Sequence, residues 1–225
     1  IQKIDHLVIG SKNINLLKSK SHISLKKKLK KNDTVVFIAA EAPVKNEKML
    51  INNLIMSSTL VMATKNKVLR QVIYISSDAV YADNDKKIDE KSITAPDSFH
   101  GIMHLSREKV FQSHFSKNLL ILRPTLIYGK EDGHLGYGPN KFLSLALKKL
   151  PISIFGNGEE KRDHVYIDYL INIIFRCINR RALGILNLVS GEVNNFRYIA
   201  ETIQKKLDIK KRIIKLKRNS PMPHN

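Results

Sequence analysis

The sequence predicts an α/β protein built around a doubly wound parallel sheet. Short apolar runs of strand length are separated by longer segments whose apolar residues recur at helical spacing. Three of these runs are Asp33–Ala40, Val72–Ile75 and Leu119–Leu122. Strands and helices that alternate at these lengths imply parallel strands, with the helices packed on the faces of the sheet.

The length and composition fit one large domain with an appendage. A chain of 225 residues can bury a substantial core. It has a single cysteine, Cys177, so a disulfide framework is excluded and a reducing compartment is expected. No run approaches the roughly 18 uninterrupted apolar residues of a membrane span, and the first residues have no hydrophobic signal core. We therefore expect a soluble protein of the cytoplasm without membrane contact.

The basic charge suggests nucleic acid as one alternative partner. The net charge is +19 at pH 7, and lysine-rich surfaces bind phosphate backbones by releasing counterions. Lysine outnumbers arginine, however, and the basic clusters Lys26–Lys31 and Lys205–Arg218 contain no aromatic residue that could stack on a base. A solvated lysine surface explains the charge better, so nucleic-acid binding is kept only as an alternative.

The most informative stretch for chemistry begins with the strand at Val72–Ile75. This strand ends at the polar pair Ser76–Ser77, and the carboxyl ends of parallel strands are where α/β proteins place their clefts. A helix is predicted to begin near His100, after a loop rich in Asp, Lys and Pro. His104 and Glu108 follow at four-residue intervals, so the three side chains share one helix face.

This stretch resembles the centre of the extended short-chain dehydrogenase/reductase family, which contains nucleotide-sugar epimerases, dehydratases and reductases. In that family a strand ends in Ser-Ser-x-x-Val-Tyr-Gly, and a Glu and a Pro follow in the loop. A helix then carries Tyr-Gly-x-x-Lys followed by Leu-x-x-Glu. The chain departs from this pattern at His100, which replaces the Tyr, and at His104, which replaces the Lys. The matching residues are Ser76, Ser77, Val80, Tyr81, Glu90, Pro96, Gly101, Leu105 and Glu108.

The resemblance implies that Ser77, His100 and His104 occupy the catalytic positions. In the family the Ser or Thr bonds the reacting hydroxyl or carbonyl, the Tyr is the acid/base, and the Lys lowers the Tyr pKa and holds the ribose. An imidazole transfers protons near pH 7, so altered acid/base chemistry is one interpretation. A metal site is a second, but zinc needs further ligands and no cysteine is near, so no metal is expected. We favour a third, that both histidines are non-catalytic.

The beginning of the chain resembles the family from its second strand onward. His6–Ile9 and Asn13–Leu17 are predicted as the second and third strands, Ser21–Lys31 as the third helix, and Asp33–Ala40 as the fourth strand. The similarity is greatest to the dTDP-4-dehydrorhamnose reductase branch. A Gly-x-x-Gly-x-x-Gly turn for the cofactor pyrophosphate is absent from this chain, because Gly10 is the only glycine before the predicted site helix. We expect a strand and most of a helix upstream.

The resemblance implies NAD or NADP as the cofactor. Ala39 and Ala40 end the fourth strand beside the cofactor, Asn53 lies in the next helix, and Pro124 belongs to an Arg-Pro-x-x-x-Tyr-Gly turn against the nicotinamide. Lys12 weakly favours NADP. Binding is expected to be weak because the glycine-rich turn and the ribose-holding Lys are both missing.

A small, partial substrate lobe is predicted after this turn. The family has a Pro-Ile strand, a Gly-x-Gly turn and an Arg-Asp pair here, and then a helix that is capped by Asp; the chain has Asp168 as that cap. Arg162 is implied to contact the diphosphate of a nucleotide-sugar, for which a guanidinium is suited. Asn140 and Lys141, which open the helix after a glycine-rich loop, are further substrate-binding candidates.

These inferences predict a Rossmann-like nucleotide-binding domain at 1–129 plus 163–190, and a substrate-binding lobe at 130–162 plus 191–225. The predicted function is NAD(P)-dependent modification of nucleotide-sugars, of the epimerase/dehydratase type used in cell-surface polysaccharide biosynthesis. The first alternative is an inactive homologue that binds a nucleotide-sugar or a partner subunit, and the second is a basic nucleic-acid-binding protein. A nucleotide-diphosphate sugar is the expected partner, and formation of a homodimer is left open.

Overall fold

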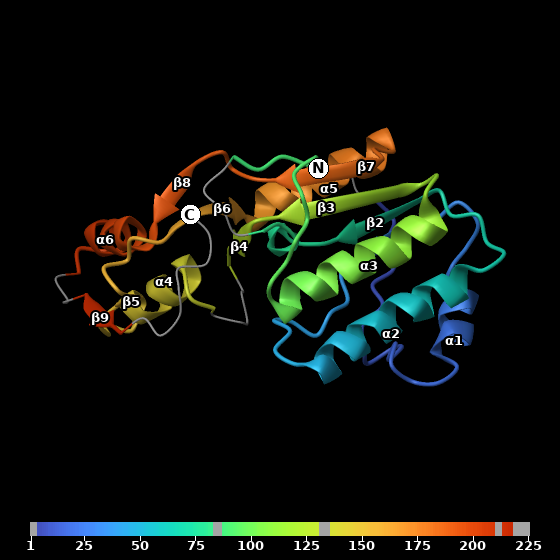
Figure 1. Cartoon of the computed structure of the whole chain (residues 1–225), viewed down its shortest axis with the longest axis horizontal. Coiled ribbons are helices and arrows are strands. Elements are labelled where there is room, and N and C mark those ends of the chain that lie inside the picture. Colours follow the sequence, from blue (N-terminus) through green and yellow to red (C-terminus); the bar gives the residue numbers. More distant parts are fainter. Residues whose placement is uncertain (1–3, 83–86, 131–135, 210–212, 218–225) are drawn as a thin grey trace. The chain divides into compact units, whose positions relative to one another are not determined.

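The computed structural model describes residues 4–82, 87–130, 136–209 and 213–217 (Figure 1). The chain divides into two compact units, each described here by itself. The first unit contains 1–81, 94–122 and 180–186, and the second contains 82–93, 123–179 and 187–225. The predicted domains were defined by what each part binds, so their boundaries at 130, 163 and 191 stay a prediction.

A four-stranded sheet, in the order β1-β2-β3-β7, confirms the predicted α/β class. Strands β1, β2 and β3 run parallel, with Val72 paired to Val35 on one side and to Leu119 on the other. Their buried side chains form near-continuous apolar runs, as expected for strands covered on both faces. The strands are β1 (Thr34–Phe37), β2 (Gln71–Ile75), β3 (Leu119–Pro124) and β7 (Gly184–Leu188).

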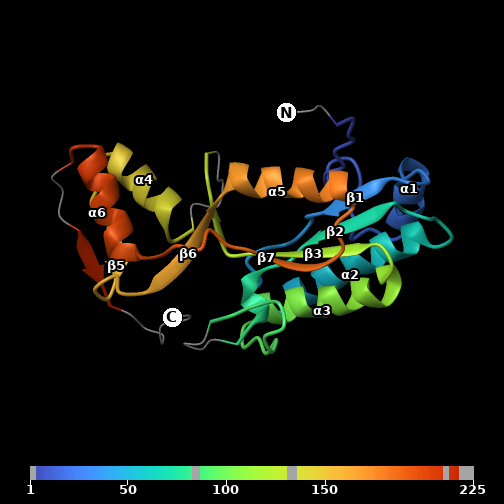
Figure 2. The same ribbon diagram turned by 90° about the horizontal axis from the view of Figure 1, so that it is seen from above.

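Three helices of the first unit pack into its core, with α2 and α3 side by side (Figure 2). Both have side-chain caps that satisfy an otherwise unpaired backbone N–H: Asn46 accepts from Met49 at the start of α2, and Ser98 accepts from Gly101 at the start of α3. The core includes Leu60, Tyr74 and Phe111, each at most 1% exposed. The helices are α1 (Ser21–Lys28), α2 (Glu47–Thr64) and α3 (Phe99–Phe115), and the short 3-10 turn η1 (Asp78–Val80) follows β2.

The two strands predicted before α1 are wrong. Residues 4–10 form no strand, and Leu7 and Val8 are 66% and 76% exposed. A strand needs a neighbouring strand for its backbone hydrogen bonds, and no described strand pairs with this segment. Asn13–Leu17 forms turns, although its apolar side chains pack against the core of the first unit. Their hydrophobicity therefore reflects packing of an irregular segment.

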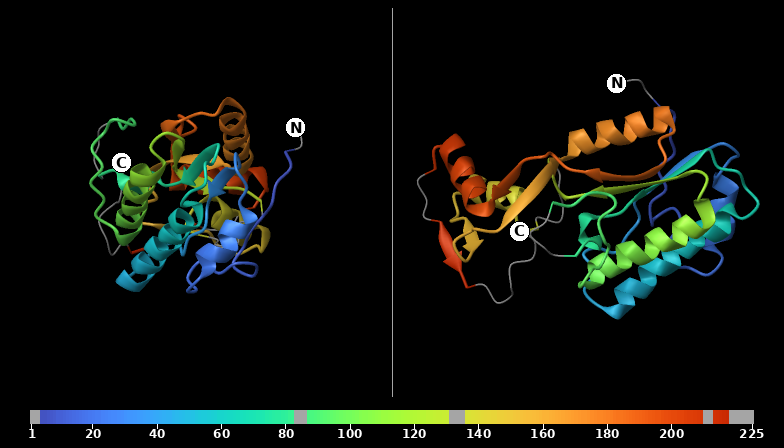
Figure 3. Two further views of the ribbon diagram at one scale, coloured as in Figure 1. Left: turned by 90° about the vertical axis from the view of Figure 1, so that its right-hand side faces the viewer. Right: turned by 45° about the horizontal axis from the view of Figure 1, so that its top comes forward.

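The second unit has its own core around Phe142, Ile154 and Phe196, each at most 1% exposed. These residues belong to α4, β5 and α6, whose ribbons lie together in Figure 3. A three-stranded sheet has the order β4-β6-β8, and β5 pairs with β9. The elements are β4 (Leu126–Tyr128), α4 (Pro139–Leu147), β5 (Ser153–Phe155), β6 (Lys161–Tyr166), α5 (Ile167–Arg180), β8 (Val193–Asn195), α6 (Phe196–Lys206) and β9 (Ile214–Leu216).

The predicted cap of α5 is wrong by two positions. The helix begins at Ile167, directly after β6, so Asp168 lies within its first turn instead of preceding it. The carboxylate still lies at the positive end of the helix dipole, where a negative charge is favourable. Cys177 of α5 is buried, as a small hydrophobic residue would be. None of the helices in the described ranges is long and apolar enough to cross a membrane.

Candidate functional site

The start of α3 is held against the turn that follows β2 by a glycine. A Cβ atom on Gly101 would lie 2.0 Å from the carbonyl oxygen of Ala79 and 2.6 Å from Cβ of Pro96, so no other residue fits without moving the backbone. This contact fixes the helix register and places His100 next to the turn. Ser77 lies in that turn, where its hydroxyl accepts from the Ala79 N–H at 3.2 Å and donates to Asp78 Oδ1 at 3.0 Å.

His100 is a partly buried imidazole beside Asp78. Burial lowers its pKa, and the Asp78 carboxylate opposes part of that effect. Its Nδ1 atom is buried and has no hydrogen-bond partner among the described residues. Buried polar atoms are almost always paired, so this atom is available for a group that is not part of the chain.

His104 is more deeply buried and is paired inside the protein. Its Nδ1 lies 2.7 Å from the hydroxyl of Tyr74 on β2, and the two rings stack with 6.0 Å between their centroids. Burial lowers the pKa of His104 well below its usual value, and the nearby His100 and Arg107 lower it further. Burial also raises the pKa of Tyr74, so the phenol keeps its proton and can donate it to Nδ1 when the imidazole carries its own proton on Nε2. His104 is therefore a neutral imidazole that is hydrogen-bonded to Tyr74.

The two imidazoles lie edge to face, with 4.7 Å between their ring centroids. Their four-residue spacing on α3 brings them together, as the sequence predicts. Within the described part of the chain, no group of three or more His, Cys, Asp or Glu side chains is arranged to hold a metal ion. Ser76 and Glu108, two residues that match the family motif, are both buried. A hydrogen bond of 2.6 Å between them connects the end of β2 to α3.

Arg107 is a buried charged residue that no sequence motif indicates. Its guanidinium is 1% exposed and donates to Ser57 Oγ at 2.7 Å, Asn53 Oδ1 at 3.2 Å and the Ala39 carbonyl at 2.7 Å. It also lies over the rings of Phe37 and Tyr74, an arrangement that stabilises a buried cation. An arginine on a helix is usually exposed, so the sequence held no signal for this burial.

Two residues that were expected to lie beside the cofactor, Asn53 and Ala39, take part in the hydrogen bonds around Arg107. Asn53 accepts from the Glu41 N–H, and its amide donates to the carbonyls of Glu41 and Met49. The Ala39 carbonyl accepts from Arg107, whereas Ala40 is exposed. Pro124 is buried at the end of β3. Asn53 therefore fixes the segment after β1, and its role in binding a cofactor stays a prediction.

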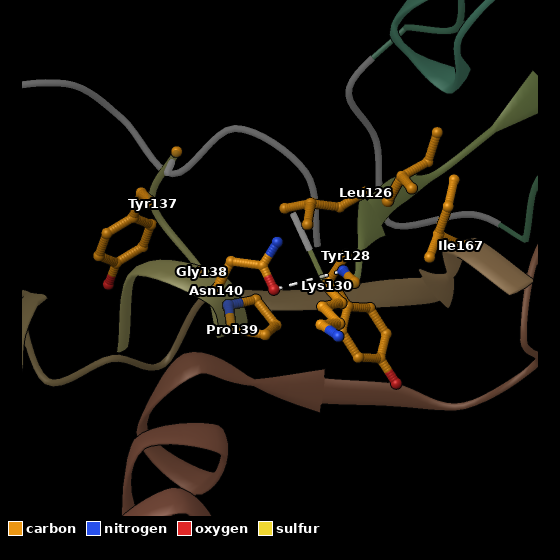
Figure 4. A pocket seen from close by; sticks show the side chains of 11 residues that line it. Leu126, Tyr128, Lys130, Tyr137, Gly138, Pro139, Asn140 and Ile167 are labelled. Carbon is orange, nitrogen blue, oxygen red and sulfur yellow. Dashed lines mark hydrogen bonds between the residues drawn. The ribbon is translucent and has the colours of Figure 1, made fainter. Parts of the chain in front are cut away.

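The second unit contains a pocket of about 510 Å³ where β4 meets the start of α4 (Figure 4). Asn140 lines it, and its Oδ1 accepts from the Gly129 N–H at 3.3 Å. Tyr128 and Lys130 also line the pocket, so it offers an aromatic ring, an amide and a cation in one place. The other two predicted substrate residues lie elsewhere: Lys141 is exposed, and Arg162 is not among the lining residues.

Arg162 lies on β6, where it is paired and partly buried. Its Nε donates to Glu160 Oε1 at 3.2 Å, and its side chain is 18% exposed. His164, two residues further along the strand, has Nδ1 3.1 Å from the Arg162 carbonyl oxygen. The Nε2 atom of His164 is buried without a hydrogen-bond partner among the described residues, and burial lowers the pKa of this imidazole. No sequence motif singled out His164.

Asp163, between these two residues, anchors a turn of the second unit. Its Oδ1 accepts from the Ser190 N–H, and its Oδ2 accepts from the Gly191 N–H, each at 2.8 Å. The hydroxyls of Ser190 and Thr125 donate to it as well. The Arg-Asp pair recognised in the sequence thus contains an internal anchor in Asp163 beside the arginine.

The parallel sheet and the residues that follow its strands define a Rossmann-like α/β protein of the extended short-chain dehydrogenase type. The chain belongs to the NAD dependent epimerase/dehydratase family, whose model matches residues 3–194. Because this match covers most of the chain, the family predicted from the central motif is confirmed. The assignment to the dTDP-4-dehydrorhamnose reductase branch stays a prediction.

Individual relatives agree with this assignment. The chain is 30% identical over 207 residues to a dTDP-D-glucose 4,6-dehydratase of Dictyostelium discoideum. The aligned region covers 83% of this chain and 45% of that protein. A UDP-N-acetylglucosamine 4-epimerase of Methanobrevibacter ruminantium, solved with UDP-N-acetylmuramic acid, has 26% identity and a TM-score of 0.80, covering 89% of this chain and 69% of that chain. A UDP-glucuronic acid 4-epimerase of Bacillus cereus, solved with UDP-glucuronic acid and NAD, has 25% identity and a TM-score of 0.77, covering 88% and 66%. The chain spans about half the length of the curated relatives it matches.

The position that the resemblance assigns to ribose binding does not supply the cation that a nicotinamide cofactor meets there in the family. The resemblance implies a lysine whose ammonium group can reach the ligand. His104 is neutral and buried, and it is hydrogen-bonded to Tyr74. Arg107, the nearby cation, donates only to protein groups in the hydrogen bonds described above. Nδ1 of His104 and the guanidinium of Arg107 are therefore used in contacts inside the protein.

Proposed function

We propose that the protein binds a nucleotide-diphosphate sugar and that it descends from enzymes that modify such sugars with NAD(P). The observation that carries the proposal is the pocket of the second unit, which places Asn140 at the start of α4 together with Tyr128 and Lys130. Two structural relatives above bind UDP-sugars, which supports this ligand class. Arg162 does not line this pocket and its Nε is paired with Glu160; we assign it to the diphosphate on the family resemblance, because a guanidinium can donate two parallel hydrogen bonds to phosphate oxygens.

The geometry supports binding better than turnover. The family pairs a phenol with an ammonium group, whereas this chain has two imidazoles whose pKa values are both lowered by burial. A neutral His104 cannot take over the electrostatic part of the lysine's task. The site is therefore proposed to be degenerate, with the nucleotide-sugar bound and the usual proton transfer lost.

A titration of the full chain with UDP-glucuronic acid tests this function. We expect binding, and we expect Arg162→Ala to weaken it about 10-fold or more, because a hydrogen bond to a charged group contributes roughly 1.5–3 kcal/mol. Arg197→Ala is the matched control, since Arg197 belongs to the same unit and is about half exposed in its pair with Glu201. Equal affinities for the two variants would contradict the role of Arg162.

A thermal-shift comparison distinguishes nucleotide-sugar binding from the nucleic-acid alternative. Duplex DNA at physiological salt is expected to stabilise the chain less than the nucleotide-sugar does, because the lysine clusters lack stacking side chains. A larger thermal shift with DNA, unchanged by Arg162→Ala, would favour the basic nucleic-acid-binding protein.

A second candidate function, altered acid/base catalysis, is favoured by His100. Its unpaired, buried Nδ1 beside Asp78 could accept a proton from a sugar hydroxyl near Ser77. Activity of this kind should follow the ionisation of an imidazole instead of a phenol, and His100→Gln should abolish it. Activity unchanged in His100→Gln would exclude this function.

The biological setting completes the proposal. The family relationship favours a role in supplying sugars for cell-surface polysaccharides, and the single cysteine favours the reducing cytoplasm. A homodimer is included as the assembly to test by light scattering at several protein concentrations.

A further inference from the structure

We propose that Tyr74 is a positioning residue: it holds His104 in a neutral, internally hydrogen-bonded state, so that this position of α3 offers no cation to a nicotinamide cofactor and the nucleotide-sugar binds without one. The part of this inference that concerns the nucleotide-sugar rests on the proposed function. The Tyr74–His104 hydrogen bond lies inside the protein and is tested without any ligand.

The geometry of Tyr74 leaves His104 one partner. Tyr74 is fully buried in the middle of the sheet, and its hydroxyl lies 2.7 Å from His104 Nδ1. Arg107 lies with its guanidinium carbon 5.2 Å from the centroid of the Tyr74 ring. The buried phenol keeps its proton, and that proton is directed to Nδ1. This arrangement requires the His104 tautomer that carries its proton on Nε2.

The charged and titratable groups around His104 all favour its neutral form. On α3, the imidazole faces His100 and Arg107, and a positive charge on either disfavours its protonation. On β2 it faces Tyr74, which burial keeps in the protonated state; Glu108 acts on that phenol in the same direction. A second cation at position 104 would therefore be placed beside Arg107 in a buried space, which is costly.

Tyr74 and His104 consequently form a matched pair. With Phe at position 74, Nδ1 would lose its donor, and a buried unpaired nitrogen is unfavourable. With Lys at position 104, the ammonium would compete with Arg107 for the phenol. The pair places an internal hydrogen bond where the resemblance implies a lysine, so position 104 offers no cation to a ribose.

Nitrogen-15 NMR of the histidine side chains of the full chain tests the pairing directly. We expect His104 to show the Nε2–H tautomer and no titration between about pH 5 and about pH 8. In Tyr74→Phe the Nδ1 signal should shift, whereas in Tyr128→Phe, which alters a tyrosine of the other unit, it should not. An Nδ1–H tautomer in the unsubstituted chain, or a His104 titration near pH 6.5, would overturn the inference even if Tyr74→Phe failed to fold.

Calorimetry tests the consequence for ligands. Affinity for UDP-glucuronic acid should change less than about twofold when NAD is added at about 1 mM, because two ligands whose binding is uncoupled do not alter each other's affinity. Tightening of about fivefold or more would overturn the cofactor-independent part, as would low-micromolar binding of NAD alone. If the sugar nucleotide does not bind at all, the proposed function fails, while the tautomer measurement still decides the role of Tyr74.

Discussion

Gly101 touches the carbonyl group of Ala79 so closely that a Cβ atom on Gly101 would overlap the oxygen, at 2.0 Å. This approach joins the first turn of α3 to the turn after β2, next to which it places His100. A shift of one residue along α3 would put a side chain into the Ala79 backbone, so the contact fixes the register of the helix. The alignment of His100 and His104 with the family's Tyr and Lys stays a prediction that this register supports.

Replacing Gly101 by Ala should destabilise the protein by about 3 kcal/mol, because the new methyl group forces backbone to move in a packed region. The loss should occur although Ala is a better helix former than Gly. Urea unfolding followed by circular dichroism measures it. The matched control is Gly10→Ala, where the nearest atom to an added Cβ is 4.0 Å away and a change within about 0.5 kcal/mol is expected. Equal stabilities of the two variants would contradict the close contact.

Replacing Arg107 by Met should cost about 3 kcal/mol of unfolding free energy. Met retains much of the side-chain volume but leaves the Ala39 carbonyl and the hydroxyl of Ser57 without their donor in a buried site. Arg197→Met, at an exposed ion pair with Glu201, should cost about 1 kcal/mol or less. Hydrogen exchange should also speed up in the segment after β1, which Arg107 holds. A mild Arg107→Met phenotype with unchanged exchange would show that the network is dispensable.

Removing the imidazole of His104 should reduce the acid sensitivity of the fold. Because burial lowers its pKa in the folded state, the unfolded chain binds more protons below about pH 6.5. The free energy of unfolding is therefore not reduced by His104 above that pH. It falls as the pH drops towards the folded-state pKa, by up to about 1.4 kcal/mol per pH unit for one group. Unfolding free energies of His104→Gln should consequently fall less steeply between about pH 7 and about pH 5. His6→Gln, at an exposed position, is the control for replacing an imidazole by an amide.

Much of the fold follows from local patterns in the sequence. Strand β2 and helix α3 are predictable because an apolar run ends at Ser76–Ser77 and because apolar positions recur after Ser98 at helical spacing. The prediction for the segment before α1 is wrong because periodicity reports burial and not the presence of a pairing strand. Its Leu16 and Leu17 are partly buried, and they pack as an irregular segment.

The proximity of the two histidines was predictable from the sequence, but their hydrogen-bond partners were not. The motif placed Ser77 and the two histidines in neighbouring segments, but a sequence does not say which buried partner an imidazole will find. Tyr74 looks like an ordinary strand residue, and Arg107 looks like a surface residue of an amphipathic helix. Their roles arise from tertiary contacts between β2, α2 and α3, which connect residues about 50 positions apart in the chain.

Replacing Asp163 by Ala should destabilise the second unit by about 2–3 kcal/mol, because its carboxylate accepts from four groups, and two of these are backbone N–H groups of the Ser190–Gly191 turn that would lose this acceptor. Asp163→Asn should cost less, since one oxygen remains to accept a backbone N–H of the Ser190–Gly191 turn. Asp168→Asn is the matched control: it is exposed in the first turn of α5, where loss of the charge costs about 0.3–1 kcal/mol. Thermal unfolding ranks the three variants, and limited proteolysis should show faster cleavage near Gly191 in Asp163→Ala alone. Cleavage at the parental rate in that variant would mean that the turn is held by other contacts.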